Sequence, residues 1–553
     1  MSVVERTLIA DDSNCRAREE ALRAVAQVSV EPTSLVAYHS QGRLLIIGEG
    51  ARAVTVAEQL DRQGLRCQVL VQGDAVTPAL FNLPMLRVSS TQRIEIRGHF
   101  GQFQVTLVGT EQGEVNVAWL LEVGREQYDL VLDLDTPTHS QWELPPLGYY
   151  APASEADLER TLKELPEMVG EFEKATFFHY NPDICAHGSR GIKGCTRCLD
   201  ACPTVAIRSL GDRVEVDPYA CQGGGSCATA CPSGAITYSY PKPADTLKRL
   251  RLLLWRYREL DGQHPMLLFH DAGPGKERLN RLSEPLPGHV IAVEIEEIGS
   301  VGMDIWLAAL AYGSSRVWLL TTAAAPPSVV HELAEQMHVT HVLLESMGYP
   351  REALSLLDGE SDCLSAAVNG DPLMPPFKPA GFVGSNAKRE TLFYALDFLA
   401  AQAPSLPAEQ PLPERAAFGE IQVDRAACTL CMACVSVCPG GALFDGIDTP
   451  RLEFLEAQCL QCGLCESACP EHAITRHPRF LFDAQRRRRR RLLHEEAAFH
   501  CIICGKPFAS VSMIERMSAK LGDHWMFQGE GALRRLQMCG DCRVRDMFGS
   551  EVG

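Results

Sequence analysis

The chain has 553 residues, 46% of them hydrophobic, and a formal net charge of −18. This length is too great for one hydrophobic core and predicts several domains, and the acidic balance argues against general nucleic-acid binding. No apolar run approaches the roughly 18 residues of a membrane span, and the N-terminus lacks a basic-then-apolar export signal. We therefore expect a cytoplasmic protein without a membrane span.

Most of the 22 cysteines fall in short-spaced clusters. In a large chain without an export signal, such clusters indicate metal ligation in a reducing compartment rather than a disulfide framework. The cysteines outside any cluster are expected to be small buried apolar residues: Cys15, Cys67 and Cys363.

The first 150 residues have the pattern of a Rossmann-like α/β domain with an N-terminal helix. A buried strand is expected at Leu44–Ile47 and a second at Cys67–Val71, separated by a glycine turn and a helix. Gly48, Gly50 and Ala53 in that segment resemble a dinucleotide-binding fingerprint, whose glycines let a pyrophosphate approach a helix N-terminus. FAD or NAD is therefore one candidate ligand.

Packing alone offers an alternative to the nucleotide. The second strand continues as Gln72-Gly73-Asp74 and lacks an acidic residue at its end, and the domain is only about half of a full dinucleotide fold. Close contact between strand, turn and helix explains the same glycines, so both interpretations stay open.

Proline-rich segments and changes of periodicity divide the rest of the chain. We expect a helical connector at 151–180, a first cysteine region at 181–243, a second α/β domain at 244–375, a helix and proline-rich linker at 376–415, a second cysteine region at 416–480, and an arginine-rich helix with a four-cysteine module at 481–553. The second α/β domain should hold strands at 266–270, 290–295, 316–321 and 341–344, with helices at 303–312 and 328–336.

The second cysteine region contains two runs of the form Cys-x2-Cys-x2-Cys-x3-Cys-Pro, which is the ligand spacing of a two-cluster ferredoxin. In that arrangement each run gives three thiolates to one [4Fe–4S] cluster and its fourth thiolate to the other. An array of zinc ions is disfavoured by the Cys-Pro endings. The expected ligand sets are Cys428, Cys431, Cys434 and Cys469 for one cluster, and Cys459, Cys462, Cys465 and Cys438 for the other.

The first cysteine region departs from this pattern at two positions, Ile192 and Gly224, where a ligand cysteine would stand. One [4Fe–4S] set can still be complete, with Cys185 replacing the missing leading cysteine. The other has three thiolates, which suit a [3Fe–4S] cluster or an open [4Fe–4S] cluster, while a site without metal is the alternative. The expected sets are Cys185, Cys195, Cys198 and Cys231, and Cys202, Cys221 and Cys227.

The tail carries two Cys-x2-Cys pairs next to glycines, which predict a closed structural Zn²⁺ site: Cys501, Cys504, Cys539 and Cys542. A rubredoxin-like iron or another cluster is an alternative, and His500 and His524 are alternative ligands. The run Arg486–Arg491 is expected to be a solvated helix face balanced by Glu495 and Glu496, with docking to an acidic redox partner or to nucleic acid as alternatives.

The expected fold class is multidomain α/β plus α+β. It comprises two ferredoxin-like dicluster modules, two small α/β domains of which the first is Rossmann-like, and a C-terminal zinc-ribbon-like module.

Region 181–480 resembles the bacterial dicluster ferredoxins. The whole chain resembles the large multi-cluster iron–sulfur proteins associated with molybdenum formate dehydrogenases, on the stretches Phe177–Pro203, Cys221–Ile236 and the tail motifs CIICGKPF and MCGDCR. Relatives of this kind usually have Cys at the position of Gly224. The stretch Val293–Thr321 resembles the delta-subunit fold of methyl-viologen-reducing hydrogenases without its cluster cysteines, which implies a structural or docking role.

These features together predict an iron–sulfur protein that relays single electrons between a redox enzyme and an acceptor; the resemblance implies formate dehydrogenase as that enzyme. No motif for a catalytic residue is apparent, so an electron-transfer protein or subunit is expected rather than a self-contained enzyme. The alternatives are an iron–sulfur oxidoreductase that binds flavin or NAD, and a redox-sensing regulator.

Overall fold

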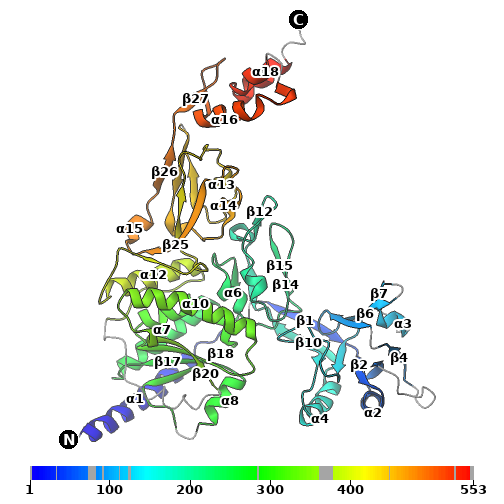
Figure 1. The fold of residues 1–553 in the computed structure, drawn as a ribbon. Coiled ribbons are helices and arrows are strands. Elements are labelled where there is room, and N and C mark those ends of the chain that lie inside the picture. The colour runs from blue at the N-terminus through cyan, green and yellow to red at the C-terminus, as the bar shows by residue number, and fades with distance from the viewer. Residues whose placement is uncertain are drawn as a thin grey trace.

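The computed structural model describes residues 3–32, 34–72, 83–89, 92–110, 113–121, 126–282, 285–359, 378–446, 449–527 and 531–548. The two α/β domains lie at one end of the molecule, and the second cysteine region and the tail extend away from them (Figure 1). The first cysteine region lies between the two α/β domains and the second cysteine region. No helix in the described ranges is long and apolar enough to cross a membrane.

The N-terminal domain is built on a parallel sheet of order β4-β3-β2-β8-β9. Its central strand β2 (Arg43–Glu49) is buried on both faces, as the continuous apolar run Leu44–Ile47 predicts. A smaller antiparallel sheet, β5-β6-β7, packs its apolar side chains on one face of this parallel sheet. The other elements are α2 (Gly50–Asp61), β3 (Arg66–Gln72), β4 (Met85–Val88), β5 (Arg93–Arg97), β6 (Gln104–Thr110), β7 (Gly113–Asn116), α3 (Val117–Leu120), β8 (Leu130–Asp133), β9 (Tyr149–Tyr150) and α4 (Glu155–Glu164).

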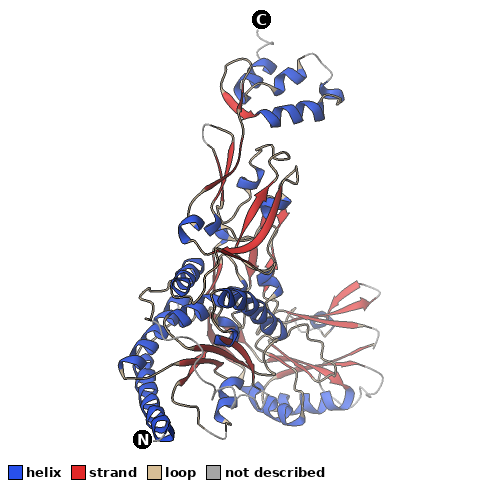
Figure 2. Cartoon of the chain, turned by 60° about the vertical axis from the view of Figure 1, so that its left-hand side comes forward, coloured by secondary structure: helices blue, strands red, loops and turns tan. Residues whose placement is uncertain are grey.

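The N-terminal helix α1 (Val3–Ala26) was expected to belong to the N-terminal domain, but it does not pack on that domain. It lies along α7 (Pro243–Glu259) of the second α/β domain, and its Ala17 and Ala21 are buried in that domain's core. In Figure 2, α1 is the long helix that begins at the N-terminal marker. Arg18 donates to the carbonyl oxygens of Pro287 and Val290 at 2.8 and 3.0 Å. The second domain therefore depends on residues more than two hundred positions upstream.

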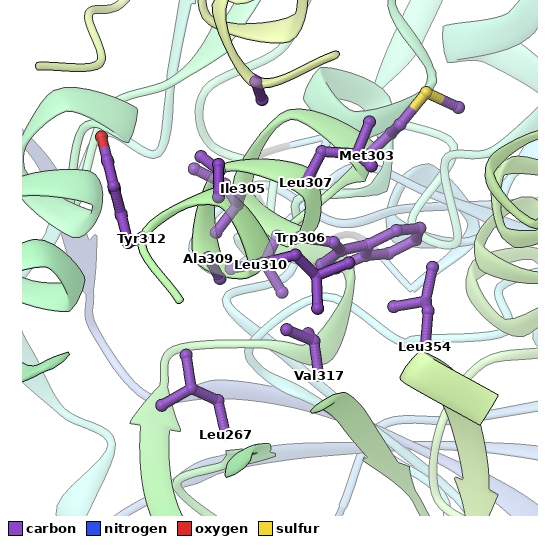
Figure 3. Packing of buried hydrophobic residues seen from close by; sticks show 14 of the residues in the cluster. Leu267, Met303, Ile305, Trp306, Leu307, Ala309, Leu310, Tyr312, Val317 and Leu354 are labelled. Atoms are coloured by element: carbon purple, nitrogen blue, oxygen red, sulfur yellow. The ribbon is translucent and has the colours of Figure 1, made fainter. Parts of the chain in front are cut away.

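The second α/β domain is a parallel sheet of order β18-β17-β19-β20. Trp306 and Leu310 of α9 pack over the sheet against Val317 and Leu354 (Figure 3). The elements are β17 (Met266–Asp271), α8 (Pro274–Asn280), β18 (Val290–Ile295), the 3₁₀ helix η4 (Ile298–Ser300), α9 (Met303–Ala311), β19 (Arg316–Thr321), α10 (Pro327–Ser346) and β20 (Leu354–Asp358).

The expected strand at 341–344 is wrong, because these residues form the last turns of α10. Leu333, Met337, His341 and Leu344 are buried at helical spacing on one face of α10. A short apolar run cannot by itself distinguish a buried strand from a buried helix segment. The fourth strand is β20, ten residues further along the chain.

The first cysteine region has two-stranded sheets, and the second has two three-stranded sheets, of order β21-β25-β22 and β23-β24-β26, where β26 (Arg491–Glu495) belongs to the tail. In both regions antiparallel strands and very short helices hold cysteine loops. In the first region these are β11 (Phe178–Tyr180), β12 (Gly188–Ser189), β13 (Ile192–Lys193), α5 (Arg197–Asp200), β14 (Ile207–Ser209), β15 (Val214–Val216), α6 (Ser226–Ala230) and β16 (Ile236–Tyr238). In the second they are β21 (Glu409–Pro411), β22 (Gly419–Val423), α13 (Ala433–Ser436), β23 (Leu443–Asp445), β24 (Arg451–Phe454), α14 (Leu464–Ser467) and β25 (Ile474–Leu481).

Connecting elements join these regions. The ribbon of β1 (Leu35–Ser40) and β10 (Gly170–Ala175) joins the N-terminal domain to the first cysteine region, and α12 (Lys388–Ala401) packs on α9. The tail contains α15 (Ala484–Arg487), β26 (Arg491–Glu495), β27 (Ala498–His500), β28 (Pro507–Ser510), α16 (Val511–Leu521), α17 (Ala532–Leu536) and α18 (Gly540–Phe548).

Candidate metal centres

The first ligand set of the second cysteine region surrounds one cavity. Cys428, Cys431, Cys434 and Cys469 all line it, together with apolar side chains. Burial raises the pKa of the Cys434 thiol to about 12, and the like charges of the other three cysteines add to that rise. The structure thus brings together the four cysteines that the spacing predicts as one ligand set, although Cys469 belongs to the second run.

The second ligand set surrounds a separate cavity, lined by Cys438, Cys459, Cys462 and Cys465. Burial raises the pKa of Cys465, and the neighbouring Cys459, Cys462 and Cys438 raise it further. Cys438 therefore lies with the three cysteines of the run that follows it, as the expected exchange of fourth ligands between the two runs requires.

The complete set of the first cysteine region is also assembled. Burial raises the pKa of Cys198, and the charges of Cys231, Cys195 and Cys185 act in the same direction. Cys185 therefore lies beside the set it was expected to complete, in place of the missing cysteine at Ile192.

The three remaining cysteines form the incomplete set. The pKa of Cys227 is raised by burial and then by the charges of Cys221 and Cys202. Gly224 belongs to the same loop, between Gly223 and Gly225, whose φ angles are +81° and +76°. Gly224 itself lies outside the left-handed region, and a Cβ there would meet only the Pro203 ring, at 3.5 Å.

The loops direct backbone N–H groups at the sulfurs. Hydrogen bonds from the N–H groups of Leu430 and Gln461 lower the pKa of Cys428 and Cys459, against the larger upward effect of burial. Leu430 and Gln461 both have φ of 54°, a left-handed conformation that is uncommon outside glycine. Successive inward N–H groups in such turns form a concavity suited to an anion.

The fourth cysteines, which precede proline, are bonded in a similar way. The N–H groups of Ala442 and Ala473 donate to the Sγ atoms of Cys438 and Cys469 at 3.3 Å in each case. These donors stabilise thiolate charge and the charge of an added electron.

Comparison with known protein families identifies these loops. Residues 421–444 and 452–475 each match the model of the 4Fe–4S binding domain, and residues 179–232 match that of the 4Fe–4S dicluster domain. Both cysteine regions are ferredoxin-type 4Fe–4S domains. No protein with a curated description matches the chain.

The sulfur spacing in these ferredoxin-type domains fits clusters rather than single metal ions. Among the described residues, the groups whose ligand atoms all lie within 4.8 Å of one another are the tail cysteines and an Asp133, Asp135 and His139 group. The ferredoxin-type sets do not meet that distance, as expected where an iron–sulfur core separates the thiolates.

The tail cysteines have the spacing of a mononuclear site. Cys501, Cys504, Cys539 and Cys542 lie within 4.8 Å of one another, and the Sγ atoms of Cys504 and Cys539 are 3.7 Å apart. A tetrahedral ion with metal–sulfur bonds of about 2.3 Å places its sulfurs about 3.8 Å apart. Burial opposes ionisation of Cys501, but backbone N–H groups of Cys504, Cys539 and Ile503 lower its pKa to about 6. The group includes neither His500 nor His524.

The arginine run is not one helix. It begins in α15 and ends in β26, and three of its members form ion pairs within the protein. Arg487 is buried and pairs with Asp397, which also pairs with Arg488 at 2.9 Å. Arg491 pairs with Glu420 at 2.6 Å. The run therefore fastens the tail to α12 and β22, a role that the expected solvated helix face did not include.

The glycine turn of the N-terminal domain packs closely on its own surroundings. A Cβ at Gly48 would lie 3.0 Å from the Leu134 Cβ and 3.6 Å from the Ala53 Cβ, so packing accounts for this glycine. Gly50 is the first residue of α2 and is buried. The N-cap Glu49 and the buried Asp133 lie at the carboxyl ends of adjacent strands β2 and β8, where their negative charges oppose a pyrophosphate.

Polar side chains that the cysteine pattern does not reveal also bond to the ferredoxin-type loops, Lys174 and Gln461 among them. Lys174 of β10 donates from Nζ to the carbonyl oxygens of Cys221 and Tyr219 at 2.5 and 3.1 Å, and burial lowers the Lys174 pKa to about 8. Gln461 donates from Nε2 to the Cys459 Sγ at 3.3 Å. A lone lysine in a strand has no sequence signal for such a role. Of the unclustered cysteines, Cys67 is buried as expected, Cys15 is half-buried, and Cys363 lies outside the described residues.

Proposed function

We propose that this protein is an iron–sulfur electron-transfer protein of the reducing cytoplasm that relays single electrons between a redox enzyme and an acceptor. The ferredoxin-type domains support an electron-transfer role. The observation that carries the relay is the contact between the two domains, because electrons tunnel only between closely spaced centres.

The contact is formed by loops that hold ligands. Burial raises the pKa of Cys195 to about 11, and the charges of Cys231 and of Cys462 from the other domain add to that rise. A Cβ on Gly194 would lie only 2.9 Å from the Leu464 Cγ. The complete set of the first domain and the second set of the second domain are therefore neighbours.

Neighbouring sets within each domain are also close. Cys198 is among the charges that raise the Cys227 pKa after burial, and Cys434 is among those that raise the Cys465 pKa. The proposed order is the incomplete set of Cys202, Cys221 and Cys227, then the set of Cys185, Cys195, Cys198 and Cys231, then that of Cys438, Cys459, Cys462 and Cys465, and last that of Cys428, Cys431, Cys434 and Cys469.

The proposed cofactors follow from the number of thiolates. Each complete set holds a [4Fe–4S] cluster, the incomplete set holds a [3Fe–4S] cluster, and the tail holds Zn²⁺. A bound cluster supplies a one-electron couple. The chain supplies the thiolates, the N–H groups aimed at sulfur, and the apolar walls that keep water out. FAD or NAD is not assigned to Gly48, Gly50 and Ala53, and a nucleic-acid role is not assigned to Arg486–Arg491, because the carboxylates near the former and the ion pairs of the latter weigh against both.

Anaerobic purification with iron, sulfide and zinc analysis tests this proposal, followed by electron paramagnetic resonance of the oxidised and reduced protein. We expect iron and sulfide for the four sets and about one zinc ion per chain. A colourless protein that contains zinc alone contradicts the proposal.

The relay itself is tested with Cys462→Ser, which removes a ligand where the domains meet. Electron transfer through the protein should fall, while Cys67→Ala, which changes a buried cysteine outside every set, should retain it. Full transfer in Cys462→Ser with that cluster lost means that the domains act separately. Reduction of the protein by a molybdenum formate dehydrogenase with formate tests the donor implied by the resemblance.

A further inference from the structure

The first two residues of α12 reach toward different ferredoxin-type domains. Lys388 donates from Nζ to the carbonyl oxygens of Ala228 and Cys231 at 2.9 and 3.1 Å, in the first domain. Arg389 donates to the carbonyl oxygens of Ala457 and Cys459 at 3.0 and 2.9 Å, in the second domain. One helix terminus thus holds ligand loops of both domains.

The two loops belong to the sets that meet between the domains. Cys231 lies with Cys195, and Cys459 lies with Cys462. Cys462 is also close enough to Cys195 for its charge to raise the Cys195 pKa, after the larger effect of burial. Lys388 and Arg389 therefore lie beside the two inner positions of the proposed relay, which we call the inner pair.

Arg389 is a partly buried cation without a carboxylate partner among the described residues. Its guanidinium also donates to the Ala417 carbonyl oxygen at 2.9 Å and lies 5.3 Å from the Phe393 ring. Partial burial lowers the Arg389 pKa to about 10, and the opposing charge that acts on it is that of Cys459. A guanidinium stays protonated in proteins, and Arg487, the other cation near Arg389, is itself paired with Asp397.

Withdrawing an unpaired charge from water, even in part, is costly unless something nearby carries the opposite charge. Four thiolates around an iron–sulfur core carry net negative charge, and an added electron increases it. A fixed cation at the Cys459 loop therefore favours the reduced state of a cluster held there.

Lys388 has a different balance. The buried carboxyl of Asp304 faces it, and the Lys388 charge acts to lower the Asp304 pKa against the larger effect of burial. Asp304 therefore offsets part of the Lys388 charge. The main effect of Lys388 is to hold the loop in place, because its three N–H donors bind the end of α6 next to Cys231.

We propose that Lys388 and Arg389 clamp the inner pair together, and that Arg389 raises the reduction potential of the cluster held by Cys438, Cys459, Cys462 and Cys465. This inference rests on the proposed electron-transfer function. In the step concerned, one electron leaves a neighbouring centre and enters this one; no bond or proton changes place. Arg389 is a positioning residue, since it acts through the Cys459 loop.

A redox titration followed by electron paramagnetic resonance tests the charge. In Arg389→Met, the ratio of reduced to oxidised cluster at this site, at a fixed potential, should fall about tenfold, which corresponds to about 59 mV for a one-electron couple. The other clusters should keep their ratios. Arg389→Lys keeps the charge and should stay near the unchanged protein.

Arg258→Met is the matched control. Arg258 is also a partly buried arginine that donates to a backbone carbonyl, that of Tyr312, but it lies in the second α/β domain. Its replacement should leave every cluster ratio unchanged. The clamp is tested separately by Lys388→Met, which should weaken the magnetic interaction between the two clusters of the inner pair.

The outcomes separate this inference from the function on which it rests. If the clusters form in Arg389→Met and the ratio of reduced to oxidised cluster is unchanged, the role of the charge is overturned. The same holds if this ratio falls equally in Arg389→Lys. Either result leaves the electron-transfer function intact. An unchanged interaction in Lys388→Met overturns the clamp. Absence of iron from the unsubstituted protein overturns the function itself.

Loss of the cluster in the neutral variant is also decisive. If Arg389→Met cannot retain this cluster but Arg389→Lys can, the charge is required and the inference is supported. If neither variant retains it, the shape of the guanidinium and not its charge is what matters, and the inference is overturned.

Discussion

Gly224 shows how much a single residue can decide at these sites. Its neighbours Gly223 and Gly225 have left-handed φ angles, and a Cβ on Gly225 would lie 2.4 Å from the Ser300 Cα. Gly224 is under neither constraint, so its backbone does not require glycine. The missing thiolate is therefore a property of the side chain alone, and it can be restored.

We expect Gly224→Cys to complete the set of Cys202, Cys221 and Cys227. The Cβ has ordinary contact distance to the Pro203 ring, so the loop need not move. The oxidised protein should lose its three-iron resonance signal and gain about one iron atom per chain. Gly225→Cys is the control, because strain and the Ser300 backbone prevent it from supplying a ligand. An unchanged signal and iron content in Gly224→Cys means that the three cysteines do not form the expected site.

Arg487 is the member of the arginine run with the largest structural role. It is 2% exposed, bonds the Leu481 carbonyl and Asp397, and lies over the rings of Phe393 and Phe480 at 4.6 and 4.7 Å. Arg487→Met should lower the free energy of unfolding by about 3 kcal/mol, because Asp397 loses its buried partner and keeps only the exposed Arg488, and the Leu481 carbonyl oxygen loses its donor. Chemical denaturation measures the change. Arg489→Met, at an exposed position of the same run, should change stability by less than about 0.5 kcal/mol; equal losses would mean that the ion pair has no special weight.

At the scale of elements, the carboxyl ends of β17 and β18 gather acidic side chains. Burial raises the pKa of Glu297 to about 7, and the charges of Asp271 and Glu296 add to the rise. The folded state therefore binds a proton more tightly than the unfolded chain, whose glutamates titrate near about 4.3. This excess proton uptake makes the fold less stable as pH rises from about 4 to about 7.

Glu297→Gln should remove this pH dependence. Its unfolding free energy should exceed that of the unsubstituted protein at pH 8 by up to about 3 kcal/mol and approach it near pH 4. Thermal or denaturant unfolding across that range provides the measurement. Glu294→Gln is the control, since Glu294 is half-exposed and paired with Lys276 at 2.8 Å. The same pH slope in Glu297→Gln as in the unsubstituted protein contradicts the assignment.

The cysteine loops were predictable from the sequence because their ligands are close in the chain and their spacing has a geometric meaning. Cys428, Cys431 and Cys434 can reach one centre only through a tight loop, and the structure contains that loop. The apolar run at 341–344 was not predictable, since burial on one face of α10 rather than local pattern decides its conformation. The role of Arg389 has no local sequence signal, because the carbonyl groups that it binds lie up to seventy positions away in the chain.

At the scale of the whole molecule, the two ferredoxin-type domains and the tail form a continuous series (Figure 1). The tail closes the end of that series. Arg516 of α16 donates to the Ala427 carbonyl oxygen at 2.8 Å, and Ser510 donates to the Thr429 carbonyl oxygen at 2.6 Å. These carbonyls flank Cys428, so the tail covers the loop of the outermost set.

The tail has little apolar core of its own besides the four-cysteine site. Its buried cluster consists of Cys501, Cys539 and Cys542 with Met538, and Phe508 packs against it. A core that small cannot offset the conformational entropy of the tail, so the bound metal should provide its stability. A strong zinc chelator should therefore unfold the tail while the ferredoxin-type domains keep their visible absorbance at first.

This last expectation is measured by limited proteolysis together with oxygen exposure. After chelation, cleavage should appear within residues 498–527 or 531–548. The cluster held by Cys428, Cys431, Cys434 and Cys469 should bleach in air faster than the others, because the tail no longer covers it. Arg516→Met is a milder variant that keeps the metal but loosens the contact with Ala427, and it should speed bleaching without new cleavage. A tail that stays protease-resistant after complete zinc removal would show that the metal is not its core.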